Sequence, residues 1–135
     1  MIRVLFLCHG NICRSPMAEF ILKDMVSTRG IADQFDIASA ATSREEIGNP
    51  VYPPAVRELA RHGISAAGKT ARQLRREDYD RYDYLLAMEA YNLPNAMGIL
   101  KADPEGKLKL LLDFTDAPGD IADPWYCGHF DRTYA

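Results

Sequence analysis

A cysteine and an arginine near the N-terminus, separated by five residues and followed by a serine, have the spacing of a phosphate cradle. The segment Cys8–Ser15 is long enough to curl so that its backbone N–H groups point at one centre. Gly10 and Asn11 tolerate the positive φ that such a curl needs. The start of a following helix adds further N–H groups and the positive end of a dipole. We therefore expect phosphate to bind here, with the Arg14 guanidinium on two of its oxygens.

The same surroundings suit Cys8 as a nucleophile. A helix N-terminus and an arginine stabilise a thiolate relative to a thiol, and the Ser15 hydroxyl is placed to donate to the sulfur. The thiolate would face phosphorus opposite the leaving group, as in-line displacement requires. The structural alternative makes Cys8 a small buried residue and Arg14 a surface cation. It does not explain why cysteine, glycine, asparagine, arginine and serine fall together between a strand and a helix.

Hydrolysis of an aryl phosphate also needs an acid that protonates the departing phenol. Asp123 is the best candidate, because Pro124 stiffens the loop that carries it. Trp125 and Tyr126 follow and are suited to flank a substrate ring. Asp-Pro is also a common turn dipeptide, but the other example, at Asp103, has no aromatic neighbour. Further acidic rivals are Asp113, Asp116 and Asp120.

Four apolar stretches alternate with helical patterns along the chain, which predicts an α/β protein. The first stretch is continuous and rich in branched residues, as in the strands of parallel sheets. We therefore expect a three-layer sandwich, in which a four-stranded parallel sheet has helices on both faces. Its ligands would bind at the carboxyl ends of the strands, where the loop Cys8–Arg14 lies. The predicted strands are Ile2–Leu7, Phe35–Ala38, Tyr84–Ala87 and Leu108–Leu112.

Helix signals fall between these strands. Ser15 is expected to cap the first helix, with Pro16 at its first position and Gly30 at its end. Glu19 is expected to support the first turn. In a later helix Pro94 marks a kink or a restart. The other predicted segments are helices over 55–61 and 89–99 and loops over 42–54 and 115–127.

The bulk composition narrows the function classes. The 135 residues suffice for one domain with a hydrophobic core, and we expect residues 1–135 to form it. A net charge of −3 lacks the basic excess of a nucleic-acid-binding protein. Three cysteines do not make a secreted disulfide framework, and the apolar run after Arg3 is too short for a signal peptide or a membrane span. We expect a cytoplasmic protein with no nucleic-acid or membrane partner.

These residues resemble the low-molecular-weight protein tyrosine phosphatase family. The resemblance implies a Rossmann-like phosphatase fold, with a central sheet of four parallel strands, and a reaction without cofactor or metal. It implies a phosphotyrosine-containing protein as substrate and inhibition by oxyanions such as phosphate and vanadate. The resemblance extends from Ile2 to Tyr134 and rests on Cys8–Glu19, Ser39–Ser43, Ile47–Pro50, Ala71–Gln73 and Asp123–Tyr126.

By position, the resemblance makes Cys8 the nucleophile that forms a cysteinyl-phosphate, Arg14 the phosphate clamp and Asp123 the general acid. Asp123 then serves as base for the water that frees phosphate. The remaining implied site residues are His9, Gly10, Asn11, Ile12, Cys13, Ser15 and Ser39 in and behind the loop, and Glu45, Trp125 and Tyr126 at the substrate pocket.

Within that second set, Ser15 resembles the hydroxyl that stabilises the thiolate, and Asn11 and Ser39 the pair whose hydrogen bonds hold the loop. For Cys13 the resemblance implies a reversible disulfide with Cys8, which would protect Cys8 from over-oxidation. A packing role for Cys13 is equally compatible with the sequence.

Three features depart from the family pattern. Lys69 stands where members often have a histidine that supports the loop asparagine. Arg44–Glu46 replaces a common aromatic pocket wall, so the wall is charged and substrate preference shifts toward basic sequences. Phe130–Ala135 resembles only the first turn of the family's final helix, so we expect that helix to be absent or truncated.

Several alternatives stay open. An arsenate reductase of the same fold needs two more cysteines in the middle of the chain, which has none. A protein arginine phosphatase resembles this loop but has threonine at Ile12, and an apolar residue favours an aryl ring. A phosphate-binding domain without catalysis would carry the same loop, although an added acid favours turnover. A metal-binding module would use Cys8, Cys13, Cys127 and His129, whose spacing matches no standard zinc pattern.

Overall fold

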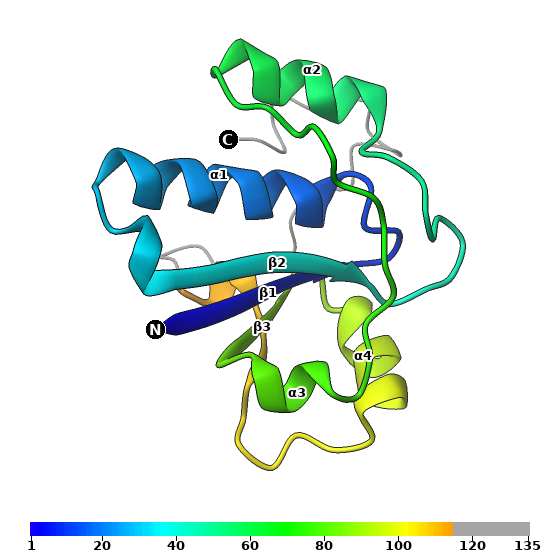
Figure 1. Cartoon of the computed structure of the whole chain (residues 1–135). Helices are drawn as coiled ribbons and strands as arrows, with labels where there is room; N and C mark the ends of the chain where they lie inside the picture. Colours follow the sequence, from blue (N-terminus) through cyan, green and yellow to red (C-terminus); the bar gives the residue numbers. More distant parts are fainter. Residues whose placement is uncertain (115–135) are drawn as a thin grey trace.

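Within the described residues, four parallel strands with helices on both faces form one sheet-centred fold, as the sequence predicts (Figure 1). The computed structural model describes residues 1–114. Its strand order is β2-β1-β3-β4, and each of the three pairings is parallel. In Figure 1, helices α1 and α2 lie on one side of the sheet and α3 and α4 on the other. The strands are β1 (Ile2–Cys8), β2 (Phe35–Ala41), β3 (Tyr84–Ala87) and β4 (Leu108–Leu110), and the helices α1 (Arg14–Thr28), α2 (Pro53–Arg61), α3 (Asp78–Arg81) and α4 (Asn92–Leu100).

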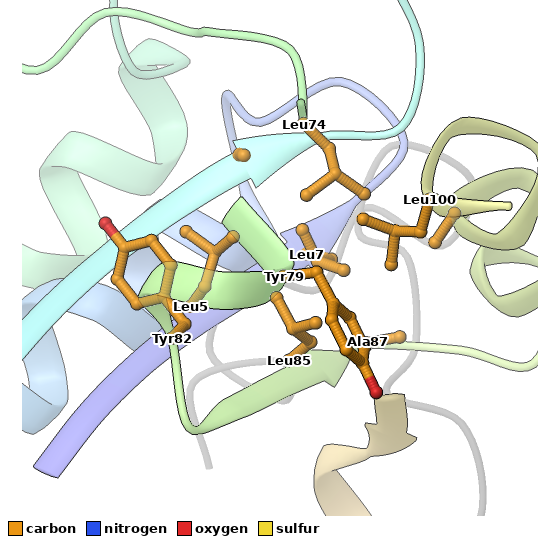
Figure 2. Close-up of a cluster of buried hydrophobic side chains, with 10 residues drawn as sticks. Leu5, Leu7, Leu74, Tyr79, Tyr82, Leu85, Ala87 and Leu100 are labelled. Atoms are coloured by element: carbon orange, nitrogen blue, oxygen red, sulfur yellow. The ribbon is translucent and has the colours of Figure 1, made fainter. Parts of the chain in front are cut away.

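The central strand β1 is buried on both faces, because its side chains alternate between two clusters. Val4 and Phe6 face α1, where they pack with Val26. Leu5 and Leu7 face the other way and are 0% exposed. Figure 2 shows this second cluster, in which side chains from the sheet meet those from α3 and α4. The two clusters fix the register of β1 and so the place where it ends, at Cys8.

The first helix begins earlier than predicted, at Arg14, and the predicted cap is wrong. Cys13 occupies the N-cap position without a capping side-chain bond, and Ser15 lies inside the first turn. Glu19 does not support that turn either, because its carboxylate binds Ser39 on β2. The end of α1 follows the prediction, since Gly30 has φ +72° beyond the last turn.

The limits of β2, α2 and α4 differ from the predicted limits, each for a local reason. Strand β2 is three residues longer than predicted and includes Ser39, because its pairing with β1 continues to Cys8–Ala41. Helix α2 begins at Pro53, since proline fits the first turn of a helix. Helix α4 begins at Asn92, which puts Pro94 in its first turn, where proline causes no kink.

Three short elements differ from the sequence prediction. Helix α3 was not predicted, nor was a 3₁₀ turn over Ala32–Gln34. Strand β4 stops at Leu110, where a second 3₁₀ turn, Leu111–Phe114, takes over. None of residues 1–114 belongs to a helix that is both long and apolar enough to cross a membrane. The predicted loop over 115–127 and the truncated final helix lie outside the described residues and stay predictions.

Candidate active site

The loop between β1 and α1 is placed at the carboxyl edge of the sheet. Strand β1 ends at Cys8 and α1 begins at Arg14, so the loop spans the shortest path from strand to helix. The side chains that matter are buried: Cys8 is 3% exposed, Asn11 1% and Arg14 4%. The loop therefore lies at the carboxyl edge of the parallel sheet, as the sequence predicts, and these three side chains are shielded from water.

The curl of the loop depends on Asn11 rather than on Gly10. Asn11 has φ +60°, a left-handed conformation that is unusual for a residue with a side chain. Gly10 does not have the positive φ expected from the sequence. A Cβ at Gly10 would lie 3.4 Å from Cγ of Glu46, which is an ordinary van der Waals contact, so neither the φ of this residue nor the space around it demands glycine. The strain at Asn11 is offset by the hydrogen bonds of its side chain.

Those hydrogen bonds fix the direction of the Asn11 amide. Its Oδ1 accepts from the Arg72 backbone N–H at 3.2 Å. Its Nδ2 then donates to Ser15 Oγ at 2.8 Å and to Ser39 Oγ at 2.9 Å. Asn11 therefore holds α1, β2 and the segment at Arg72 together around the loop, which confirms the expected Asn11–Ser39 contact.

Ser15 lies between the Asn11 amide and the Cys8 sulfur. Its Oγ accepts from Asn11 Nδ2 and lies 2.9 Å from Cys8 Sγ. When Cys8 is a thiolate, which has no proton to give, the Ser15 hydroxyl is the donor in this contact. The backbone N–H of Asn11 also donates to this sulfur, at 3.2 Å. Two donors on one sulfur are the arrangement that suits an accepting thiolate. The expected Ser15 contact with Cys8 is present.

Behind Ser39 the network ends on a buried carboxylate. Glu19 is 4% exposed and accepts from Ser39 Oγ at 2.5 Å. Lys23 donates to its other oxygen at 2.5 Å. From the sequence, Glu19 was expected only to support the first turn of the helix. A charged residue on the inward face of an amphipathic helix was the signal that this role was incomplete.

Lys69 also joins this network. Its Nζ donates to the Ser39 carbonyl at 3.0 Å and lies 3.6 Å from Glu19 Oε1. Burial lowers the pKa of Lys69, and the charge of Glu19 only partly offsets this effect. The lysine at the family's histidine position therefore makes its own contact with the strand that carries Ser39.

Arg14 is oriented by a carboxylate that the sequence analysis did not single out. Its Nη2 donates to Glu89 Oε1 at 3.0 Å, and the Arg14 side chain is 3% exposed. Glu89 comes just after β3, the strand next to β1, so the topology brings it to the same edge. The position of Glu89 after a buried strand was the available signal.

The mouth of the site has an acidic and aromatic rim. His9 Nε2 lies 3.0 Å from Glu45 Oε2, and the two side chains are 39% and 69% exposed. The ring of Tyr91 lies 6.4 Å from that of His9, and Tyr91 is 63% exposed. Tyr91 was not predicted. Ser43 ties this rim to the loop through its hydroxyl, which donates to the His9 carbonyl at 2.8 Å.

The remaining loop residues, Ile12 and Cys13, face different surroundings. Ile12 is half-buried. Its carbonyl accepts from the Tyr52 backbone N–H at 2.7 Å. Cys13 is buried among apolar side chains that include Met17 and Val51. Neither Cys8 nor Cys13 forms a disulfide in the described part of the chain.

Several predicted site residues are not placed by the structure. Asp123, Trp125 and Tyr126 lie outside the described residues, as do the rivals Asp116 and Asp120. Of the other acids, Asp103 is excluded as a general acid by its position before β4, at the opposite edge of the sheet from Cys8. In the part of the chain up to residue 114, no three histidine, cysteine or acidic side chains gather as a metal site would require.

Comparison with known proteins gives the geometry a context. The profile of the family described as low molecular weight phosphotyrosine protein phosphatase matches residues 3–135. YfkJ of Bacillus subtilis, named a low molecular weight protein-tyrosine-phosphatase, is 39% identical over 134 residues, which cover 98% of this chain and 86% of YfkJ. Its crystal structure superposes with a TM-score of 0.94 over 99% of this chain and 86% of that one.

Two further proteins widen the comparison. The low molecular weight phosphotyrosine protein phosphatase of Sus scrofa is 39% identical over 126 residues, covering 91% of this chain and 79% of that protein. The solved structure of Vibrio vulnificus Wzb in complex with benzylphosphonate is 26% identical and has a TM-score of 0.85. It covers 98% of this chain and 89% of Wzb.

Proposed function

Because the chain belongs to the low molecular weight phosphotyrosine protein phosphatase family, we propose that it hydrolyses phosphotyrosine in proteins through a cysteinyl-phosphate on Cys8. The observation that carries the proposal is the Cys8 sulfur, which lies 2.9 Å from the Ser15 hydroxyl and accepts from the Asn11 backbone N–H at 3.2 Å. Such donors stabilise an attacking thiolate.

In the first step the phosphate lies in the loop against Arg14, as a charge-assisted clamp requires. The Cys8 thiolate attacks phosphorus, a sulfur–phosphorus bond forms, and the bond to the phenolic oxygen breaks. Asp123 gives its proton to that oxygen, so that tyrosine leaves neutral.

In the second step Asp123, now a carboxylate, accepts a proton from water as the water oxygen attacks phosphorus. The sulfur–phosphorus bond breaks, inorganic phosphate leaves, and Cys8 is again a thiolate. All bonds and protons are supplied by the substrate, water, Cys8 and Asp123. Free phosphate and vanadate-type oxyanions compete for the same loop and inhibit.

The aryl preference follows from the loop itself. Ile12 is half-buried and apolar, which suits contact with a phenyl ring. Wzb, in the same family of structures, was solved with benzylphosphonate, an aryl compound. A protein arginine phosphatase and a phosphate-binding domain without turnover are the alternatives.

Redox control and location complete the proposal. Residues 1–135 act as a single domain in the cytoplasm, where a reducing environment keeps Cys8 and Cys13 as thiols. A peroxide oxidises the Cys8 thiolate to a sulfenic acid, and the Cys13 thiol attacks it to form a disulfide with loss of water. Thiol reductants reverse the bond.

Hydrolysis of p-nitrophenyl phosphate near pH 6 with EDTA present tests the proposal. The parent protein and Cys13→Ser should turn over substrate, and Cys8→Ser should lose activity by at least about a thousandfold. Turnover that survives in Cys8→Ser would overturn the covalent role of Cys8. Phosphate binding without turnover in the parent would favour the binding-domain alternative.

A further inference from the structure

Arg72 lies outside the loop but contacts it directly. It belongs to the segment 71–74, which runs beside the end of β2: the Ala41 N–H donates to the Arg72 carbonyl at 2.7 Å, and the Leu74 N–H to the Ala41 carbonyl at 2.7 Å. From this position the Arg72 N–H donates to Asn11 Oδ1 at 3.2 Å. The backbone of one residue thus connects the edge of the sheet to the loop.

The Arg72 N–H decides how the Asn11 amide is oriented. If the amide were reversed, Nδ2 would face the Arg72 N–H, donor against donor, and Oδ1 would face the two hydroxyls. Ser15 could then donate to Oδ1 instead of to Cys8. By holding the amide in this orientation, an N–H that stands 61 positions along the chain from Asn11 keeps the Ser15 hydroxyl available to donate to the sulfur, 2.9 Å away.

The Arg72 side chain is anchored separately, by a buried acid. Its Nη1 and Nη2 donate to the two oxygens of Asp78 at 3.0 and 3.2 Å. Asp78 is 5% exposed and also accepts from the Arg75 backbone N–H at 2.8 Å. Burial alone would lower the pKa of Arg72, but the hydrogen bonds and charge of Asp78, with further contributions from Tyr82, outweigh it and raise the pKa. The Arg72 guanidinium therefore keeps its charge.

We propose that the Arg72–Asp78 ion pair is a positioning device for the nucleophile, which holds the Arg72 N–H on Asn11 and so directs the Ser15 proton onto the Cys8 sulfur. Arg72 and Asp78 touch neither sulfur nor substrate and act through Asn11. The consequence for turnover rests on the proposed function, whereas the consequence for the sulfur can be measured without turnover.

The experiment compares Asp78→Asn with two other variants. Asp78→Asn keeps the shape of the acid and removes its charge. Arg72→Lys keeps the charge and loses the two-pronged contact. Asp36→Asn is the matched control, because it breaks another Arg–Asp pair of helix α3, with Arg81 at 3.3 Å, away from the loop. All three leave the other charged groups near the loop unchanged, namely His9, Arg14, Glu19, Lys23, Glu45, Lys69 and Glu89.

The readout is the rate of Cys8 alkylation by iodoacetamide as a function of pH, followed by mass spectrometry of the Cys8 peptide. We expect Asp78→Asn to raise the pH of half-maximal Cys8 alkylation by about one unit. A shift of this size corresponds to the loss of one charge-assisted hydrogen bond to the sulfur. Arg72→Lys should show a smaller rise, and Asp36→Asn none. If the parent is a phosphatase, kcat/KM of Asp78→Asn falls about tenfold at slightly acidic pH.

Two outcomes would overturn the inference. One is an Asp78→Asn protein that melts earlier but keeps the parental pH of half-maximal alkylation, which would make the pair structural only. The other is an Arg72→Lys protein in which the pH of half-maximal Cys8 alkylation equals that of the parent. This second outcome decides the question if Asp78→Asn does not fold. A parent that fails to hydrolyse aryl phosphate but shows the alkylation shift contradicts the proposed function and leaves this inference standing.

Discussion

Asn11 illustrates how a single side chain can settle the chemistry of its neighbour. Its amide uses one acceptor and two donors, all inside the protein, so its own orientation is fixed. Ser15 does not need its proton for Asn11 and can donate it to a Cys8 thiolate. At the residue scale, the number of donors and acceptors in the network determines which group donates to the sulfur, in addition to the distances between them.

Ile12 is the residue at which substrate choice can be tested. Ile12→Thr replaces an apolar contact for an aryl ring by a hydroxyl that can bind a guanidinium phosphate. We expect the ratio of phosphoarginine to aryl phosphate turnover to rise about tenfold or more, from steady-state kcat/KM on both substrates. Ile47→Thr, at an exposed position, is the control. An unaltered ratio in Ile12→Thr would sink the assignment of Ile12 as the selective residue.

The loop motif predicted the residues that touch the sulfur but few of those that stand behind them. Cys8, Asn11, Ser15 and Arg14 are close in sequence, so local spacing was enough. Glu89 and the segment at Arg72 reach the loop from 75 and 61 positions away. The place of Glu89 after a strand and the resemblance at 71–73 indicate the edge of the sheet, but not which atoms of the loop they contact. Glu19 was misassigned for the related reason that capping rules consider only the helix to which a residue belongs.

Whether an element was predicted from the sequence depended on its length and on how apolar it is. Helix α3 has four residues, which is too short for helical periodicity to appear, yet it supplies Asp78. The end of β2 is Ser39-Ala40-Ala41, small residues without strand propensity, and pairing with β1 extends the strand through them. Strands β1 and β3 were predicted within one residue because both are apolar and buried.

The position of the loop depends on β1, and β1 depends on its packing. Leu5 is 0% exposed and lies among side chains of the sheet, α3 and α4. We expect Leu5→Ala to lower the free energy of unfolding by about 3 kcal/mol, because it leaves a cavity in that cluster. Urea unfolding measures the loss, with Val56→Ala, at a 38% exposed position on α2, as control. A loss no larger than that of the control would contradict the packing described for β1.

At the scale of the whole molecule, Asp103 links helix α3 to the start of strand β4. Its carboxylate accepts from the Tyr79 hydroxyl at 2.7 Å, on α3, and from the Lys107 and Leu108 N–H groups at 2.8 and 3.2 Å, at the start of β4. Burial alone would raise the pKa of Asp103. The hydrogen bonds from Tyr79 and the backbone outweigh it, so the pKa lies below its usual 3.8.

This direction fixes how stability depends on pH. The folded protein holds the Asp103 carboxylate more strongly than the unfolded chain does, so its contribution is present above pH 3.8 and is lost as the pH falls below 3.8. Asp103→Asn should therefore cost about 1 kcal/mol at pH 7, and the difference from the parent should narrow below pH 3.8. Urea unfolding at several pH values measures it, and a difference that stays constant into acid would contradict the assignment.

The topology of the whole was the most predictable feature. Alternating apolar stretches and helix signals predicted the α/β class, the parallel sheet and the edge at which the loop lies. The sequence could not show which side chains meet across that edge, because the strand order and the paths of the connecting segments bring them together.

Trapping the intermediate tests the central claim most directly. The protein is mixed with an aryl phosphate, quenched in acid within milliseconds, digested and examined by mass spectrometry, with Asp123→Asn included to slow the second step. We expect a phosphoryl group on the Cys8 peptide, in a larger fraction of the Asp123→Asn protein. Rapid turnover with phosphate on another residue, or on none, would contradict it.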